Sequence, residues 1–232
     1  MVSICEILYV DWFNPFQNKM QGKKVSCEAI ILYCMNPLPE MRFLPKNTFF
    51  LCIIPGPNKP DPDTISHILK PMVKILHKLW CGKVFHMFRY PAGMEHRVIV
   101  VPLITDLLAI RLVSGFLSHS TMMYCSWCKL TENKREGLDY MNWEMRDAEE
   151  VIEQAAKWKG HTTQAHRKRQ VKAMGVCWTP LYDLPYWNPV SHLILGFMHN
   201  TLEGILEKQN SLIQRKSLLR TLWRRFIANL RN

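Results

Sequence analysis

The sequence of 232 residues lacks the features of several common protein classes. No apolar run approaches the ~20 residues that a membrane-spanning helix requires, and the start of the chain has neither a basic leader nor a small-residue cleavage site. Eight cysteines are too few for a secreted disulfide scaffold of this size. No Gly-rich phosphate loop is present, which argues against nucleotide hydrolysis. We therefore expect an intracellular, reduced protein outside the membrane.

Positive charge and apolar residues, in contrast, are abundant. Thirty Lys and Arg against 19 Asp and Glu give a formal net charge of +11, which favours polyanionic partners such as nucleic acid. Hydrophobic residues make up 48% of the chain, enough for a substantial core, so the chain as a whole is not disordered. The length allows one large domain or slightly more, and we find no internal repeat.

The first half of the sequence predicts three strands followed by a helix. Turn residues separate three β-branched or apolar runs, which predicts an antiparallel meander. These runs span residues 4–10, 25–33 and 49–54. An apolar stripe with spacings of three and four predicts a helix over 65–79, with Asp63 or Thr64 as its N-cap.

The second half predicts one buried strand and several helices. Residues 98–103 are apolar on both faces, as a central strand requires. Helical patterns follow over 107–117, 146–174 and 192–208. The predicted fold class is therefore α/β, a mixed sheet of three antiparallel strands, a helix and further strands, with a helical, basic C-terminal half.

Asp11 and Asp106 each lie at the carboxyl end of a predicted strand. Ligand sites of open α/β sheets gather at this end of the strands. Two neighbouring carboxylates suit Mg²⁺, and a pair of metal ions can stabilise both oxygens of a phosphodiester displacement. The alternative is structural, because Asp also starts turns and caps helices.

A third acid would have to come from a distant segment. Glu203 is a candidate because it follows His199 by four residues and so shares its helical face. The structural alternative is an ordinary solvent-facing glutamate.

Seven short blocks follow one another along the chain. They are D-W-F-N-P-F at 11–16, I-I-P-G-P at 53–57, V-P-L-I-T-D at 101–106, G-F at 115–116, C-S-W-C at 125–128, L-P-Y-W at 184–187 and M-H at 198–199. In order and rough spacing they resemble the transposases of CACTA (En/Spm-like) DNA elements, especially the fungal branch. The resemblance covers residues 5–208.

This resemblance implies an RNase H-like catalytic core with a DDE triad that cuts DNA at transposon ends and joins it to a target. Carried over, the triad falls on Asp11, Asp106 and Glu203, which would hold two Mg²⁺ (or Mn²⁺) ions. His199 would orient the third acid or a phosphate. The resemblance also implies DNA as the partner, self-association and a nuclear location.

One departure from the family pattern supports a second hypothesis. The family usually has Asp three residues before the histidine of the Met-His block, whereas this sequence has Gly196. The alternative function is therefore a catalytically dead, transposon-derived module that binds DNA or protein. A third possibility is a zinc-stabilised scaffold without a role on DNA.

Cys125 and Cys128 have the spacing of a zinc knuckle. A tetrahedral site needs two further ligands, for which His119 is one candidate. The others are His161, His166 and Cys177. The structural alternative is a pair of free thiols in a buried turn.

The expected organisation has four parts. Residues 1–130 are the first part of the catalytic core, 131–190 a helical and loop insertion, 191–210 the helix with the third acid, and 211–232 a basic amphipathic tail. The insertion contains a basic stretch, 157–172, which suits the DNA backbone or is simply a solvated helical face.

Overall fold

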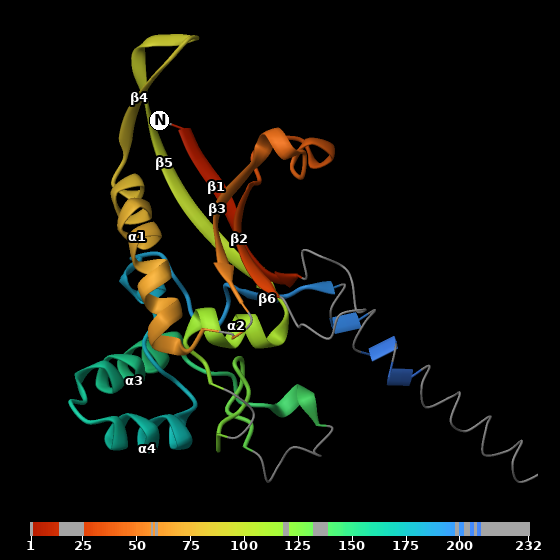
Figure 1. The fold of residues 1–232 in the computed structure, drawn as a ribbon, viewed down its shortest axis with the longest axis vertical. Helices are drawn as coiled ribbons and strands as arrows, with labels where there is room; N and C mark the ends of the chain where they lie inside the picture. Colours follow the sequence, from red (N-terminus) through yellow and green to blue (C-terminus); the bar gives the residue numbers. More distant parts are fainter. Residues whose placement is uncertain are drawn as a thin grey trace, which may run out of the picture. The chain divides into compact units, whose positions relative to one another are not determined.

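The computed structural model describes residues 2–13, 26–56, 58, 60–117, 121–131, 139–197, 200–201, 205–206 and 208–209. The chain divides into two units, Met1–Ile194 and Leu195–Asn232, and the fold described below belongs to the first (Figure 1). None of the helices in the described part is both long and apolar enough to cross a membrane.

A mixed sheet forms the centre of this unit. Its strands are β1 (Val2–Phe13), β2 (Cys27–Cys34), β3 (Thr48–Pro55), β4 (Lys83–Met87), β5 (Tyr90–Thr105) and β6 (Leu193–Leu195). The order is β3-β2-β1-β5-β4, and β6 also pairs with β5. Strands β1, β2 and β3 are antiparallel neighbours, which confirms the predicted meander. Strand β5 lies parallel to β1.

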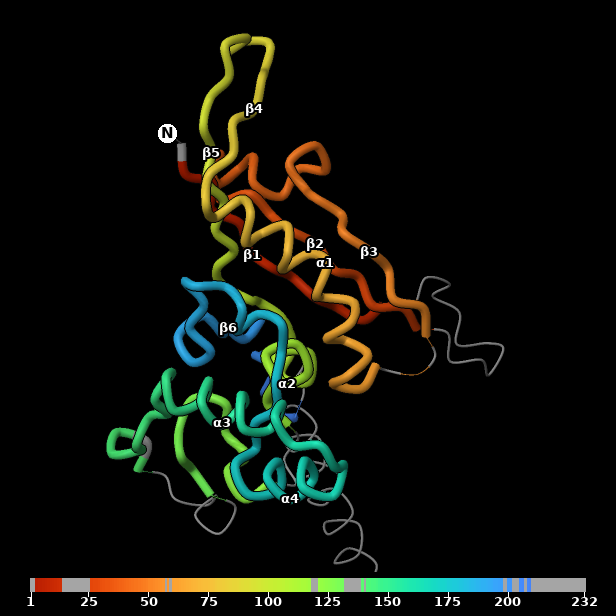
Figure 2. The backbone as a smooth tube through the Cα atoms, turned by 90° about the vertical axis from the view of Figure 1, so that its left-hand side faces the viewer, coloured from red at the N-terminus to blue at the C-terminus, as the bar shows by residue number. Residues whose placement is uncertain are grey.

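Four α-helices accompany the sheet: α1 (Pro62–Trp80), α2 (Leu107–Ser114), α3 (Ala148–Gly160) and α4 (Gln164–Met174). Short 3₁₀ turns occupy Pro39–Met41, Pro45–Asn47, Tyr140–Asn142 and Pro180–Asp183. Helix α1 runs along one face of the sheet (Figure 2) and buries Ile65, Leu69, Val73 and Leu76. The fold class is thus α/β with a mixed sheet, as predicted.

Helix α1 begins two residues earlier than an N-cap at Asp63 or Thr64 allows. Its N-cap is Asp61, whose side-chain carboxylate accepts a hydrogen bond of 2.7 Å from the Thr64 backbone N–H. The predicted cap was wrong because Pro62 takes the first helical position, for which proline's fixed φ is preorganised. The bond to Thr64 lowers the pKa of Asp61.

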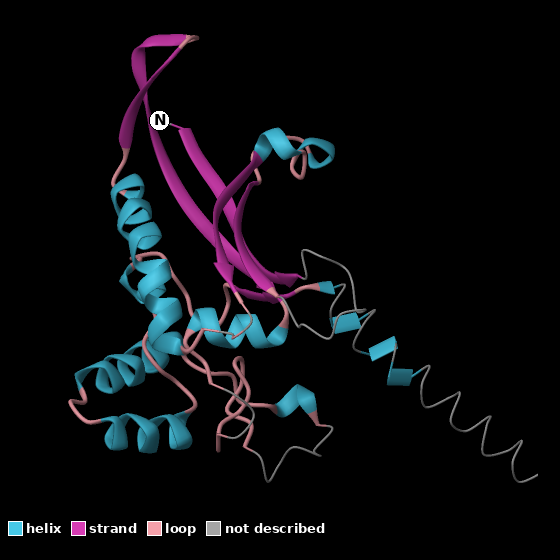
Figure 3. Cartoon of the chain, in the orientation of Figure 1, coloured by secondary structure: helices cyan, strands magenta, loops and turns pink. Residues whose placement is uncertain are grey.

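Three other predicted elements differ from the structure (Figure 3). The helix expected over 107–117 ends at Ser114 because Gly115 takes a left-handed φ of 78°. The helical pattern over 146–174 forms two helices, since Thr163 starts a new one as the N-cap of α4.

The helix expected over 192–208 is wrong in its first turn, where Leu193–Leu195 form β6. Its apolar residues pair with a strand from a distant part of the sequence, a contact that helical periodicity cannot detect. Of the rest of that range, 198–199, 202–204 and 207 lie outside the described residues, as does the tail at 211–232.

Replacing Asp61 with Ala removes the α1 cap and should lower the free energy of unfolding by about 1 kcal/mol. Because the folded-state pKa of Asp61 is lowered, this contribution is present at neutral pH and disappears as the pH falls through the folded-state value. Urea denaturation of both proteins at neutral and acidic pH measures the difference.

The matched control is Asp63→Ala, which changes an exposed carboxylate in the first turn of the same helix without removing the cap. It should cost clearly less than Asp61→Ala. Equal losses in the two variants would contradict the assignment of Asp61 as the cap.

Candidate functional site

Asp11 and Asp106 lie at one edge of the sheet, where the neighbouring parallel strands β1 and β5 approach each other. Val10 pairs with Thr105, so the next residue on each strand is one of the two aspartates. The Thr105 side chain is buried, and its hydroxyl donates a hydrogen bond to the Val10 carbonyl. This bond fixes the two strands together immediately before the acids.

Asp11 does not start a turn, because β1 continues through it and pairs it with Ala29 of β2. Tyr9 lies two residues earlier, on the same face of the strand, and its hydroxyl donates a hydrogen bond of 3.1 Å to Asp11 Oδ2. Burial, together with the hydrogen bond to Asp11 and the charges of Asp11, Tyr33 and Asp106, raises the pKa of Tyr9 to about 12. Tyr9 is therefore a neutral donor at physiological pH, close to both acids.

Asp106 is the N-cap of α2. Its Oδ1 accepts a hydrogen bond of 2.6 Å from the backbone N–H of Ala109. The structure thus confirms the helix-capping role that was the structural alternative for Asp106, and Oδ1 performs it.

The two carboxylates are both only partly buried and provide the hard oxygen donors that Mg²⁺ prefers. This donor set fits a divalent cation. The other two predicted site residues, Glu203 and His199, lie outside the described residues. The structure therefore places Asp11 and Asp106 directly after a paired position on neighbouring strands, and the triad itself stays a prediction.

Cys125 and Cys128 form a tight turn. The Cys125 sulfur accepts hydrogen bonds from the backbone N–H groups of Trp127 and Cys128, both at 3.4 Å. Cys128 is buried, and burial together with its hydrogen bond to Cys125 raises the pKa of Cys128 to about 11. Without a metal ion, this thiol is neutral at physiological pH.

The remaining zinc candidates are not assembled around this turn in the described part of the chain. His119 lies outside it, and the described residues contain no group of three or more His, Cys, Asp or Glu suited to a metal ion. The rings of His161 and His166 lie 5.7 Å apart. Cys177 is buried, and burial and Asp63 raise its pKa to about 12.

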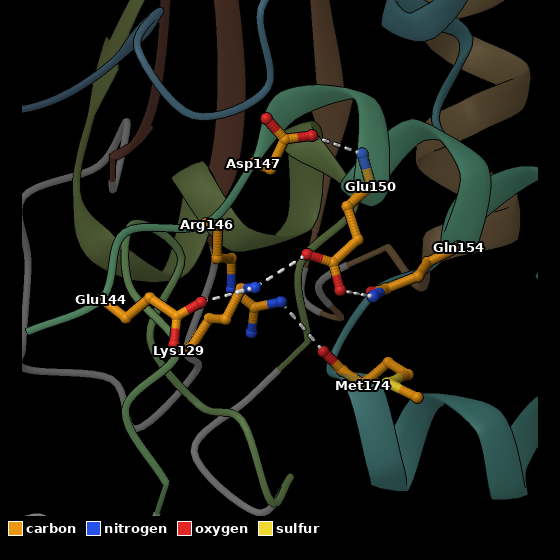
Figure 4. Close-up of polar contacts among 7 residues, drawn as sticks. All are labelled: Lys129, Glu144, Arg146, Asp147, Glu150, Gln154 and Met174. Carbon is orange, nitrogen blue, oxygen red and sulfur yellow. Dashed lines mark hydrogen bonds and ion pairs between the residues drawn. The ribbon is translucent and has the colours of Figure 1, made fainter.

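The buried side chain of Arg146 organises the polypeptide around the cysteine turn. Its guanidinium donates to the carbonyl oxygens of Cys125 (2.8 Å), Met123 (2.9 Å) and Met174 (3.2 Å). Figure 4 shows the bond to Met174, at the end of α4. One cation thus joins the cysteine turn to α4.

Lys129 provides a second connection from this turn. Its ammonium lies 2.9 Å from a carboxylate oxygen of Glu144 and 3.0 Å from one of Glu150 (Figure 4). Glu150 belongs to α3, whose N-cap is Asp147. Three segments, the cysteine turn and helices α3 and α4, therefore share one polar network.

The basic stretch 157–172 contains cations that contact aromatic rings and cations that are exposed to solvent. The Arg167 guanidinium lies 4.8 Å from the centre of the Trp158 ring, and the Lys159 ammonium lies 3.8 Å from that of Trp178. These contacts hold helices and loop together. Lys168, Arg169 and Lys172 are exposed on α4, which leaves three cations accessible to a polyanion.

Sequence reasoning missed three residues that matter here. Tyr9 could have been found, because a residue two positions before Asp11 shares its face in any strand. Thr105 and Arg146 carry no such signal. Their partners are backbone carbonyls far away in the sequence, and no side-chain pattern reports those.

Replacing Arg146 with Ala should lower the free energy of unfolding by about 3 kcal/mol or more, because three carbonyl groups lose a charged donor. Thermal or urea denaturation measures the loss. Arg169→Ala, at an exposed position on α4, is the matched control and should change stability little. Comparable losses in the two variants would show that Arg146 does not have this role.

Comparison with known proteins identifies the family. Residues 3–145 match the family model described as transposase family tnp2, whereas no curated protein matches the chain. The matched region includes β1, α1, β5 and α2, and with them Asp11, Asp106 and the cysteine turn. It spans more than half of the sequence, and the chain therefore belongs to the tnp2 transposase family.

Proposed function

We propose that the protein is a DDE-type transposase of the CACTA (En/Spm-like) group, fungal branch, which cleaves and transfers DNA strands at transposon ends with Mg²⁺ as cofactor. The observation that carries this proposal is the position of Asp11 and Asp106. They follow a paired position on two neighbouring parallel strands, inside the region that matches the family.

The topology supports an RNase H-like core. An antiparallel meander of three strands leads through α1 to a strand that returns parallel to β1. This connection places the ends of β1 and β5 at one edge, where α/β sheets bind their ligands. We place Asp11 and Asp106 at that edge as two catalytic acids, and Glu203 stays the candidate for the third acid of the triad.

Each described acid has a neighbour that orients it. Tyr9 donates to Oδ2 of Asp11, and the start of α2 holds Oδ1 of Asp106. We assign Oδ2 of Asp106 and the carboxylate of Asp11 to the cation. When bound, Mg²⁺ supplies Lewis-acid stabilisation of the attacking and leaving oxygens of the phosphodiester. The Tyr9 hydroxyl and the backbone N–H at the start of α2 orient the two carboxylates for that role.

DNA is the proposed partner, as transposon ends and as target, and the nucleus is the proposed location. The exposed cations on α4, Lys168, Arg169 and Lys172, can pair with phosphates, which contributes affinity without reading sequence. Self-association is part of the same proposal, because strand transfer between two element ends needs both ends held together.

The test of catalysis is nicking of supercoiled plasmid DNA in Mg²⁺ or Mn²⁺. Asp11→Asn and Asp106→Asn should each reduce the rate by about 100-fold or more, since each removes a charged ligand. Asn is as good an N-cap as Asp, so Asp106→Asn keeps the start of α2 and separates chemistry from folding. Asp183→Asn, distant in sequence from both strands, is the control and should nick at the wild-type rate.

Salt-sensitive DNA binding without nicking, unchanged by Asp11→Asn, would contradict the enzyme. That result would favour the alternative function, an inactive DNA-binding module, which is also the hypothesis that Gly196 supports because the family usually has Asp at this position.

We also propose that the cysteine turn binds a structural zinc ion, with Cys125 and Cys128 as two ligands and His119 as a third. Two backbone N–H groups donate hydrogen bonds to the Cys125 sulfur and fix its position in the turn. Because Cys128 must lose a proton whose pKa is about 11 in the metal-free protein, zinc affinity should rise with pH above neutrality.

Metal analysis should therefore find one zinc ion per chain, and a chelator should lower the melting temperature. Cys128→Ser should abolish both effects. The exposed Cys81 provides the control, because Cys81→Ser should keep zinc. A metal-free protein that melts at the same temperature with and without the chelator would contradict the zinc site.

A further inference from the structure

A basic, acid-free segment runs from α1 into the hairpin formed by β4 and β5. The 31 residues from Thr64 to Met94 contain no Asp or Glu, although the chain has 19 acids in 232 residues. They contain five Lys or Arg residues: Lys70, Lys74, Lys78, Lys83 and Arg89. None of the five forms an ion pair within the described part of the chain.

Three of these cations form a stripe on the outer face of α1. Lys70, Lys74 and Lys78 are spaced by four residues, so they lie above one another on the helix, about 6 Å apart along its axis. All three are exposed, whereas Leu69, Val73 and the other buried residues of α1 point to the sheet. The stripe is therefore open to solvent along two turns of the helix.

The hairpin continues from the end of α1 and projects beyond the sheet (Figures 1 and 2). Strand β1 first pairs with β5 at His96, so residues 83–95 form a ribbon of only two strands. Met87 pairs with Tyr90, which leaves Phe88 and Arg89 as a two-residue turn at the tip. A two-stranded ribbon has no core of its own.

This ribbon nevertheless exposes large apolar side chains. Phe88 at the tip is 100% exposed, Val84 52% and Tyr90 47%. Phe85 and Met87 are each 39% exposed. A concentration of exposed apolar residues on one projecting element marks a binding surface.

The positive charge of the segment indicates what kind of partner it binds. Apolar side chains alone would suit a protein, but five cations without an acid suit a polyanion. Nucleic acid offers both a phosphate backbone for the lysines and stacked bases for an aromatic tip. Proteins that contact the minor groove insert Phe and similar residues between base steps and so bend the duplex.

We propose that the β4–β5 hairpin and the Lys70–Lys74–Lys78 stripe form one DNA-bending surface, in which Phe88 wedges between base pairs and the lysines contact the adjacent backbone. This inference depends on the proposed function only in taking DNA as the partner. It concerns a surface made of α1 and the hairpin rather than the two aspartates. A bend at this surface would distort the duplex that the enzyme must cut.

The test is a binding assay in EDTA, which prevents cleavage, with a duplex of about 30 base pairs carrying a fluorescent donor and acceptor at its ends. Wild-type protein should increase energy transfer as it bends the duplex. Phe88→Ala should abolish the increase and weaken binding by about tenfold. Phe49→Ala, at a 53% exposed Phe of β3, is the matched control and should behave as wild type.

The lysine stripe has a separate readout. Replacing Lys70, Lys74 and Lys78 together with Gln should reduce the slope of log affinity against log salt concentration by about 2.7, which is about 0.9 for each phosphate that the variant leaves unneutralised. Energy transfer at saturating protein should persist in this variant. Both variants should keep the wild-type melting temperature, because all four side chains are exposed.

Wild-type affinity, salt slope and energy transfer in both variants would overturn the proposal. So would a loss of self-association in Phe88→Ala with unchanged DNA binding, because the hairpin would then contact a second copy of the chain. Nicking distinguishes the two proposals. A protein that bends DNA through Phe88 but never nicks it would support the bending surface and contradict the proposed enzyme. A protein that nicks DNA at the same rate with and without Phe88 and the three lysines would support the enzyme and contradict the bending surface.

Discussion

The parallel pairing of β1 with β5 is the constraint on which the candidate site depends. Two segments almost 100 residues apart are joined by a strand ladder that ends at Val10 and Thr105, with the Thr105 hydroxyl bound to the Val10 carbonyl. A shift of one residue in this register would move one aspartate away from the other and reverse the face of every side chain beyond it. The neighbouring positions of the two acids are thus a property of backbone pairing.

Much of the sheet was predictable from the sequence, and the reasons for the failures are physical. The meander and α1 are encoded locally, by apolar periodicity and turn residues. The β4–β5 hairpin was missed because its residues are exposed on both faces and so show no alternation. Strand β6 was missed because Leu193–Leu195 satisfy a helical pattern equally well, and pairing with β5 decided between them. The positions of Asp11 and Asp106 follow from the predicted strand ends, and that of Tyr9 from the alternation of faces along a strand. Thr105 and Arg146 act through contacts with distant backbone carbonyls, which periodicity does not record.

Helix α4, unlike the other three helices, is held by polar contacts and not by apolar burial. Helix α4 buries none of its residues. Its end is held by Arg146, and its start by the Thr163 cap and by Arg167, which donates to the His161 carbonyl. A region built in this way is specified by a few hydrogen bonds, and its structure is accordingly sensitive to the loss of single donors.

Under the proposed function, Asp106 has a structural and a catalytic role, and this has a consequence for how related genes decay. Because its carboxylate starts α2, selection for a folded chain preserves an acid or amide at this position even after strand transfer has been lost. Asp11 caps no helix, so an abandoned copy is free to lose it first. Under the proposed function, the residue at position 11 is therefore the more informative sign of a working enzyme among descendants of such elements, and an intact Asp106 alone says little.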